Sequence, residues 1–444
     1  MGKNILVLGA GFVAKPCVQY LLRNPEYSVF VADKIKSQVD SVLGGHPRGH
    51  AIYGDVNSSM GKWVEEVKPD IIVTLLPNPF FYPVARFCVD RRLDFILPTT
   101  ATPEVVAISK EIESAGICCI AELGVDPGID HMIAMKSIEE IKGSGGSVTG
   151  FWSVCGSLPA PGSNNNPLGY KMSWAPNHVV YAGTRDARYL EDSDTVFYPG
   201  GDTFENYHLI KVDGVGWFEC YADGNSLPYA DLYGINTGEM RKIFRGTLRY
   251  PGWCEFYTSL RKIGIFSNER IDTKGMTYNS LLRKLTRLND SDDLKISLAQ
   301  FLGVPVFSSV ITRLQWLGLF DEKTLPLEAE SPSEIFCRLL VEKLAYEPGE
   351  KDLVVMEQRI DYRDQDGRDH VRISRLVEEG FVGRETAIAR TTGVPIAMGA
   401  EMILEGVFRK PGLSIPVLPE IYQVLLEMLE KEGIRLTETV SASF

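Results

Sequence analysis

Two glycines near the N-terminus are spaced as in sites that bind phosphate groups. Gly9 and Gly11 follow the apolar run Asn4–Leu8, and Ala14 completes the pattern G-x-G-x-x-A. This pattern lets a buried strand turn sharply into a helix and brings backbone N–H groups close to a pyrophosphate. The partial positive charge at the N-terminus of the helix also favours phosphates. These residues predict a dinucleotide site contacted by Gly9, Gly11, Phe12 and Val13.

An acidic residue stands where such a site binds ribose. Tyr27–Ala32 is a second apolar segment, and Asp33 ends it about 20 residues after the glycines, where a carboxylate accepts a hydrogen bond from a ribose hydroxyl. This carboxylate would repel a 2′-phosphate, so we expect NAD as the cofactor. Lys34 and Lys36 could neutralise such a phosphate, which leaves NADP possible. Asp55 and Val56 follow a third short strand, at a position expected to flank the adenine.

Strand-like and helix-like segments alternate from Asn4 to Ala121. This order predicts an α/β fold with a doubly wound parallel sheet of the Rossmann type. Ligands bind such sheets beyond the carboxyl ends of the strands. We therefore expect three turns to face one site, 76–78, 98–101 and 124–128. The residues expected to line it are Leu76, Thr99, Thr100, Val125, Asp126 and Pro127.

The pattern changes after Gly146. Residues 148–155 alternate like a strand, 156–166 read as a loop rich in Pro, Gly and Asn, and short strand-like segments continue to Arg249. We expect a second, mixed α+β domain for substrate binding and dimerisation, with a largely antiparallel sheet. A helical insertion is expected at about 252–347, followed by a hairpin of 353–360 and 370–376. The predicted domains are 1–130, completed by C-terminal helices within 386–444, and 131–385.

Composition excludes several classes of protein. The formal net charge of −12 argues against nucleic acid or an anionic membrane as a partner. No apolar stretch approaches the ~18 residues of a membrane span, and the N-terminus reads as a strand rather than a signal peptide. The eight cysteines form no C-x-x-C pair, which is typical of a reduced, cytoplasmic protein. The six histidines lie far apart, so we predict no metal site.

Several longer motifs resemble the saccharopine dehydrogenase family, specifically its glutamate-forming branch, also called saccharopine reductase. The resemblance covers nearly the whole chain. Its most specific part is the stretch Asn166–Trp174, which reads N-P-L-G-Y-K-M-S-W. The other matching segments are 9–13, 124–132, 158–161, 245–250 and 392–398.

The resemblance implies an NAD(P)-dependent oxidation of a secondary amine that links two amino acids. In saccharopine these are glutamate and 2-aminoadipate 6-semialdehyde, so the substrate is a small amino-acid compound of lysine metabolism. We also expect a homodimer. By resemblance, Asp126 and Cys155 are the candidate proton-transfer residues. Cofactor or substrate contacts are implied for Val125, Asp126, Pro127 and Ser173, and an amino-acid pocket for Thr247, Leu248 and Arg249.

Two departures from the family pattern concern the substrate. Thr99-Thr100 stands where the family usually has Ser-Tyr, and Gly224 stands where it has an arginine expected to bind a carboxylate. An arginine–carboxylate pair is bidentate and strong, so its loss changes which substrate the site can hold. Two alternatives therefore stay open. One is an imine reductase for another amino-acid or polyamine conjugate, and the other is a catalytically silent dinucleotide sensor.

Some of these residues also have ordinary structural explanations. Asp126 could cap the helix that follows it, Arg249 could be a surface charge, and Cys155 could be a small buried side chain. His131 is expected to be structural. Lys171 could either bind a substrate carboxylate or anchor its own loop.

Overall fold

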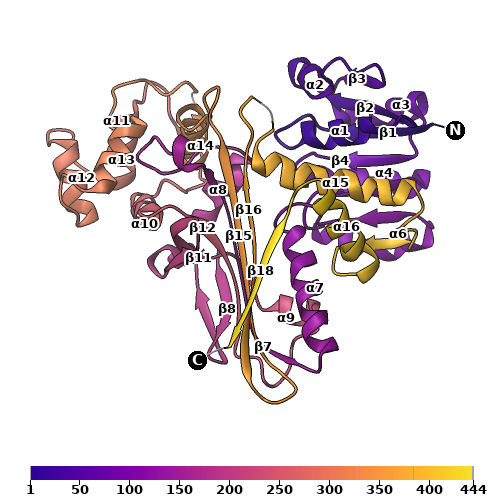
Figure 1. The fold of residues 1–444 in the computed structure, drawn as a ribbon. Helices are drawn as coiled ribbons and strands as arrows, with labels where there is room; N and C mark the ends of the chain where they lie inside the picture. The colour runs from indigo at the N-terminus through magenta and orange to yellow at the C-terminus, as the bar shows by residue number, and fades with distance from the viewer. Residues whose placement is uncertain (1, 328, 384, 443–444) are drawn as a thin grey trace. The chain divides into compact units, whose positions relative to one another are not determined.

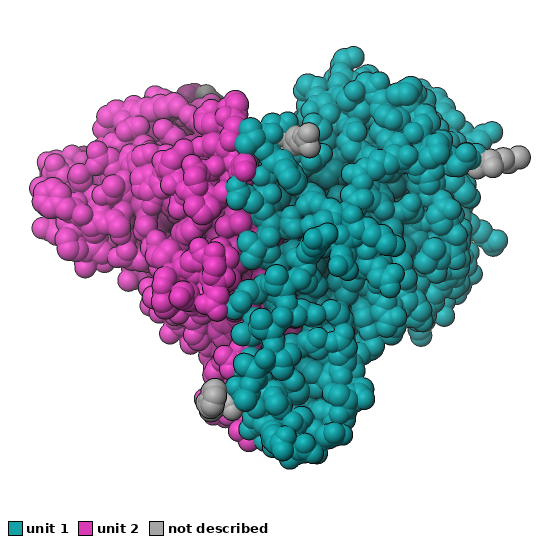
Figure 2. All heavy atoms as spheres, viewed as in Figure 1, with its two compact units in different colours: residues 1–148, 360–444 teal, residues 149–359 magenta. Residues whose placement is uncertain are grey.

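The computed structural model describes residues 2–327, 329–383 and 385–442. Figure 1 shows its ribbon, and Figure 2 colours the two compact units into which the chain divides. Unit 1 comprises Met1–Val148 and Ile360–Phe444, and unit 2 comprises Thr149–Arg359. The predicted functional division at 130/131 and 385/386 stays a prediction.

Unit 1 is built on a seven-stranded sheet in which all neighbouring strands are parallel. Its order is β17-β6-β5-β4-β1-β2-β3. The strands read as continuous apolar runs because helices cover both faces of such a sheet. The predicted fold class is confirmed. The bounds are β1 Lys3–Leu8, β2 Tyr27–Asp33, β3 Gly49–Tyr53, β4 Ile71–Thr74, β5 Asp94–Ile96, β6 Cys118–Ile120 and β17 Gly412–Ser414.

The helices of unit 1 come from both ends of the chain. They are α1 Ala14–Arg23, α2 Lys36–Leu43, α3 Val56–Val67, α4 Phe81–Arg91, α5 Pro103–Ala107, α6 Ser109–Ser114, α7 Ile129–Gly143, α15 Ala387–Leu404 and α16 Pro419–Lys431. Helix α15 packs tightly on α1, since a Cβ on Gly393 would lie 2.4 Å from the carbonyl oxygen of Val13. In the same unit β16, Asp369–Glu379, pairs antiparallel with β18, Leu436–Ala442.

The segment after β5 forms two short helices rather than one. Helices α5 and α6 are separated at Ile108, and Thr102, which precedes α5, makes no side-chain capping hydrogen bond. Strand β17 was not predicted, because three residues are too few to show a periodicity.

Unit 2 contains strands in the order β10-β11-β12-β7-β15, with β8 beside β12 and β9 beside β8. Strand β12 runs parallel to β7, whereas the pairs β10 with β11, β11 with β12, β12 with β8, and β8 with β9 are antiparallel. The sheet is therefore largely antiparallel, as expected, with a parallel pair at β12 and β7. The bounds are β7 Ser147–Pro159, β8 Ala187–Glu191, β9 Asp194–Tyr198, β10 His208–Val212, β11 Gly216–Ala222, β12 Lys242–Arg249 and β15 Asp352–Arg363.

Strand β7 continues four residues past its predicted end at Cys155. The sequence pattern predicts that a loop starts at Gly156. A Cβ there would lie 2.7 Å from the Cβ of Leu248, so this glycine allows close packing between β7 and β12.

The helices of unit 2 include the expected insertion. They are α8 Pro176–Tyr181, α9 Pro228–Leu232, α10 Trp253–Ile263, α11 Tyr278–Thr286, α12 Leu294–Leu302, α13 Ser309–Leu317 and α14 Pro332–Lys343. A short pair of strands, β13 Ile271–Asp272 and β14 Ala329–Glu330, lies before α14.

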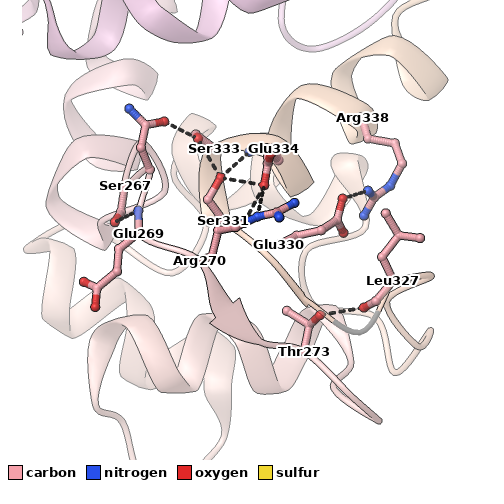
Figure 3. Close-up of polar contacts among 11 residues, drawn as sticks. Ser267, Glu269, Arg270, Thr273, Leu327, Glu330, Ser331, Ser333, Glu334 and Arg338 are labelled. Atoms are coloured by element: carbon pink, nitrogen blue, oxygen red, sulfur yellow. Dashed lines mark hydrogen bonds and ion pairs between the residues drawn. The ribbon is translucent and has the colours of Figure 1, made fainter.

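Figure 3 shows the polar contacts around the start of α14, where Ser331 and Glu334 form a capping box. Glu330 pairs with Arg338 beside it. The capping box satisfies backbone N–H groups at the N-terminus of α14 and so stabilises the helical insertion.

In the described part of the chain, no helix combines the length and the apolar character needed to cross a membrane.

Candidate functional site

The glycine turn has the geometry needed for a dinucleotide. Gly9 has a φ of 104°, and a Cβ on it would lie 2.9 Å from the carbonyl oxygen of Leu75, so no other residue fits without strain. A Cβ on Gly11 would meet no atom within 4 Å, which leaves room for a ligand. Helix α1 begins after Val13 without a side-chain cap, so its first N–H groups have no side-chain acceptor. This turn fits a pyrophosphate.

Asp33 ties the end of β2 to this turn. Its Oδ2 accepts a hydrogen bond from the N–H of Ala10 and its Oδ1 accepts one from the N–H of Ile35, both at 2.9 Å. A carboxylate has about four lone-pair sites, so Asp33 can still accept from a ribose hydroxyl. Beside it, the ammonium of Lys36 lies 4.6 Å from the centre of the Tyr53 ring.

The other predicted cofactor residues lie where strands of the same sheet end. Asp55, after β3, caps α3 by accepting from the N–H of Asn57 at 2.8 Å. Leu76 follows β4 and is half-buried, and Thr99 and Thr100 follow β5. Because the carboxyl ends of parallel strands meet at one edge, the fold brings these positions to the same edge as Gly9.

The loop that carries Asp126 is held by its own backbone. The N–H of Gly124 donates to the carbonyl of Pro127, and the N–H of Ile129 donates to the carbonyl of Gly124, each at 2.9 Å. The buried Asp130 accepts from the N–H of Gly128 at 2.5 Å. Asp126 is exposed, whereas Val125 before it is buried. The loop thus presents a carboxylate from a fixed backbone.

A buried pair beside this loop was not predicted. His131, which exposes none of its surface, has Nε2 2.7 Å from Oε2 of Glu122. Glu122 has a φ of 61°, which is uncommon for a residue other than glycine. The pair joins the end of β6 to the start of α7, in agreement with a structural role for His131.

In unit 2, two neighbouring strands bring the predicted substrate residues together. Cys155 on β7 is opposite Thr247 on β12. Thr247 and Arg249 alternate with Leu248, so they share one face of β12 while Leu248 lies on the other. Leu248 exposes none of its surface and belongs to the hydrophobic core. Its predicted role in an amino-acid pocket stays a prediction.

Arg249 is a buried cation surrounded by aromatic rings. Its guanidinium lies 4.9 Å from the ring centre of Tyr170, 5.4 Å from that of Trp253 and 6.0 Å from that of Tyr221. One amino group donates to the carbonyl of Leu248 at 2.8 Å, but Nε has no acceptor. No carboxylate within residues 2–327, 329–383 and 385–442 lies within ion-pair distance of Arg249. The alternative that Arg249 is a surface charge is therefore wrong.

Burial opposes the charge of Arg249, yet the surrounding groups favour it. Tyr221, Tyr170, Tyr257 and Asp223 raise the pKa of the guanidinium above its usual value. The arginine stays charged and is available to an anion.

Next to this residue lies an ion pair that sequence reasoning missed. The hydroxyl of Thr247 donates to Oδ2 of Asp223 at 2.9 Å, while Arg185 pairs with Oδ1 of the same carboxylate. One signal for Asp223 was available in the sequence, because this residue directly precedes Gly224, where the segment departs from the family pattern. Arg185 gave no signal, because it lies 38 residues away in sequence.

Lys171 and Ser173, both from the stretch 166–174, are buried in unit 2. The ammonium of Lys171 lies 2.7 and 2.5 Å from the carboxylate oxygens of Glu350, so Lys171 anchors its own loop. Ser173 is buried, with its Oγ 3.0 Å from Oγ of Ser157. Cys155 is half-buried.

The chain matches two family models. Residues 5–120 match the saccharopine dehydrogenase NADP binding domain, and residues 124–434 match the saccharopine dehydrogenase C-terminal domain.

Curated relatives and one solved structure agree with these matches. A saccharopine dehydrogenase [NADP(+), L-glutamate-forming] of Saccharomyces cerevisiae is 32% identical, with the alignment covering all of both chains. The mitochondrial alpha-aminoadipic semialdehyde synthase of Bos taurus is 34% identical over 98% of this chain, which spans 47% of that protein's length.

The apo structure of saccharopine dehydrogenase (L-Glu forming) from Saccharomyces cerevisiae matches with a TM-score of 0.89. It is 30% identical, and the match covers 99% of this chain and all of that one. With both halves of the chain matched to the same family and its fold reproduced, the protein belongs to the saccharopine dehydrogenase family.

Proposed function

We propose that the protein catalyses the reversible, NADP-dependent oxidation of a secondary amine that joins two amino acids. The reaction is saccharopine, NADP+ and water to glutamate, 2-aminoadipate 6-semialdehyde, NADPH and a proton, or its reverse, in lysine metabolism. The names of relatives that match the whole chain support this proposal, since they are called NADP(+)-dependent and L-glutamate-forming.

The observation that carries the proposal is the buried Arg249, which has no carboxylate within ion-pair distance in the described part of the chain. Burying a charge costs several kcal/mol unless another group compensates it. A carboxylate of the substrate supplies that compensation through a charge-assisted hydrogen bond, and Nε is a donor still to be satisfied. An amino-acid substrate carries the carboxylate that this site lacks.

The residues that would hold the cofactor are those of the glycine turn and the strand ends. Gly9, Gly11, Phe12 and Val13 would approach the pyrophosphate, and Asp33 with Lys34 would meet the ribose. When bound, the nicotinamide accepts or supplies the hydride, and the protein contributes by positioning the reacting groups.

NADP rather than NAD is supported by the family model and by the engagement of Asp33. Both oxygens of Asp33 already accept backbone N–H groups, which reduces the repulsion of a 2′-phosphate that we expected from the sequence. Lys34 would pair with that phosphate.

Asp126 and Cys155 would transfer protons to and from the substrate nitrogen and the attacking water. Asp126 suits this role because its carboxylate is exposed on a fixed loop. Ser173, Thr247 and Arg249 would bind the amino-acid parts, while Thr99 and Thr100 would contact the substrate from the end of β5.

The test is to mix the purified protein with saccharopine and either NADP+ or NAD+, and to follow reduction of the cofactor by absorbance. Reduction with saccharopine supports the proposal, whereas reduction only with another amino-acid or polyamine conjugate would assign a different imine reductase. Cofactor binding without turnover of any conjugate would favour the silent sensor. Arg249→Gln is expected to reduce turnover of saccharopine through a higher KM.

We also keep the predicted domain division, the homodimer and the cytoplasmic location as proposals. Leu209 and Trp217, on neighbouring strands β10 and β11, expose 58% and 54% of their surfaces and suit a contact between copies. Sedimentation at several concentrations would decide between a monomer and a dimer. All eight cysteines are free thiols, which suits a reducing compartment.

A further inference from the structure

Arg185 and Asp223 form a half-exposed ion pair at the side of the predicted substrate pocket. The side chains expose 35% and 37% of their surfaces. Asp223 is bound on both oxygens, by Arg185 on one and by the hydroxyl of Thr247 on the other. Thr247, which is expected to contact the substrate, is therefore hydrogen-bonded directly to this ion pair.

The charges in this part of unit 2 do not cancel. Arg249 stands two residues after Thr247 on the same face of β12, and Asp223 acts electrostatically on both Arg185 and Arg249. Glu219, opposite Arg249 on β11, is engaged elsewhere, since its carboxylate accepts from the N–H groups of Gly252 and Cys254 at 2.6 and 2.8 Å. Asp223 thus pairs with Arg185, while Arg249 has no carboxylate within ion-pair distance among the described residues, which leaves one positive charge for a ligand.

The side chain of Arg185 lies over the backbone of Gly224. A Cβ on Gly224 would lie 3.8 Å from Cδ of Arg185, and Gly224 itself has a φ of 67°. On another side, the guanidinium lies 5.6 Å from the ring centre of Tyr181. Arg185 is thus positioned by Asp223 and by Tyr181, while a third of its side chain remains accessible.

We propose that Arg185 is a specificity-determining residue that binds a second substrate carboxylate, next to the one bound by Arg249. The pair of arginines would select an amino dicarboxylate such as glutamate over its neutral amide. Asp223 holds Arg185 in place and is the positioning residue. This inference rests on the proposed function and assigns the part of the site that recognises the glutamate-type half.

The test compares glutamate with glutamine, which has the same shape but no side-chain charge, as the amine in the reductive direction. Arg185→Gln is expected to raise KM for glutamate about ten- to a hundredfold, the loss of one charge-assisted contact, and to leave kcat and the KM for glutamine unchanged. The matched control is Arg188→Gln. Arg188 is exposed, lies over the Phe197 ring on the neighbouring strand, and should change neither value.

A double variant separates binding of the substrate from neutralisation of Asp223. If Arg185 only neutralises Asp223, then Arg185→Gln combined with Asp223→Asn restores the wild-type KM for glutamate, and the inference is wrong. If Arg185 binds the substrate, KM for glutamate stays high in the double variant. Equal effects of Arg185→Gln on glutamate and glutamine would also overturn the inference.

Calorimetric binding of glutamate and glutamine to the protein with NADP+ keeps this test independent of turnover. Wild-type protein that shows no turnover but binds glutamate more tightly than glutamine, with that preference lost in Arg185→Gln, would contradict the proposed function and support the role of Arg185. Normal turnover, with the preference for glutamate over glutamine retained in Arg185→Gln, would support the proposed function and contradict the role of Arg185.

Discussion

Lys171 and Glu350 form a buried ion pair, with 6% and 12% of their side chains exposed and 2.5 Å between the ammonium and Oε2. The carboxylate also accepts from the N–H of Glu347 and from the amide of Asn165, both at 2.7 Å. The pair therefore joins the loop before α8 to the segment that leads into β15. Because its ammonium is paired with Glu350, Lys171 is not available to a substrate carboxylate.

The first prediction concerns the stability of this pair. Lys171→Met should lower the free energy of unfolding by about 3–5 kcal/mol, because it leaves Glu350 buried without its partner. Lys171→Met combined with Glu350→Gln should recover part of that loss. Urea denaturation measures both variants. A variant with unchanged stability but weaker substrate binding would instead place Lys171 in the substrate pocket.

Asp126 is predicted to act on turnover rather than on cofactor binding. Its loop is fixed by backbone hydrogen bonds, so Asp126→Asn should preserve the loop and remove only the carboxylate. The expected loss in kcat is about 10²- to 10⁴-fold, the usual contribution of a general acid or base. Fluorescence titration with NADPH should give the wild-type Kd. Wild-type turnover would show that Asp126 only caps the helix.

The cofactor preference is predicted to depend on Lys34. Lys34→Ala should weaken NADPH binding about tenfold or more, the loss of one charge-assisted contact, and leave NADH binding unchanged. Lys36→Ala is the control, since Lys36 lies over the Tyr53 ring. Titration of each variant with both cofactors measures the difference. Tighter binding of NADH than NADPH by the wild type would instead restore the NAD preference that Asp33 first suggested.

Gly224→Arg is predicted to bring no gain with saccharopine. The position has a φ of 67°, so any side chain there costs roughly 1 kcal/mol of stability. Arg185 already supplies a guanidinium beside it. Gly224→Ala carries the same backbone strain without the charge, and comparing kcat/KM of the two variants isolates the arginine. A higher value for Gly224→Arg than for Gly224→Ala would mean that the site lacks a cation.

The pKa of His178 should depend on the charge of Arg185. Burial and, after it, the positive charge of Arg185 lower the pKa of His178, while Asp223 acts in the opposite direction. Arg185→Gln should therefore raise this pKa, and Asp223→Asn should lower it further. NMR titration of the imidazole measures both shifts. An unchanged pKa in both variants would place the ion pair away from His178.

The lowered pKa of His178 also sets a direction for stability. The unfolded chain takes up the proton first as the pH falls, so the native state loses stability from about pH 6.5 down through the folded pKa. Above about pH 6.5 this contribution is constant. Thermal unfolding of wild type and His178→Gln across this range tests the sign, and the wild type should lose more stability towards acid pH.

Local patterns in the sequence were enough to predict six of the seven strands in the sheet of unit 1, and also the family. The strand from Asn4 to Leu8, the turn at Gly9 and Gly11, and the acid at Asp33 are signals that span a few residues each, and the fold class is confirmed. Their chemistry is local too, because a glycine at a positive φ is required by the turn itself. The roles of the individual site residues stay predictions.

Contacts between distant segments were decided only by the tertiary structure. Lys171 meets Glu350 across 179 residues, and Arg185 meets Asp223 across 38. Strand β17 completes a sheet that begins at Lys3, and β12 runs parallel rather than antiparallel to β7. The sequence pattern around a charged residue is the same whether its side chain pairs within the protein or is available to a ligand. Folding places the carboxylate of Glu350 against Lys171, whereas it places no carboxylate of the described residues within ion-pair distance of Arg249.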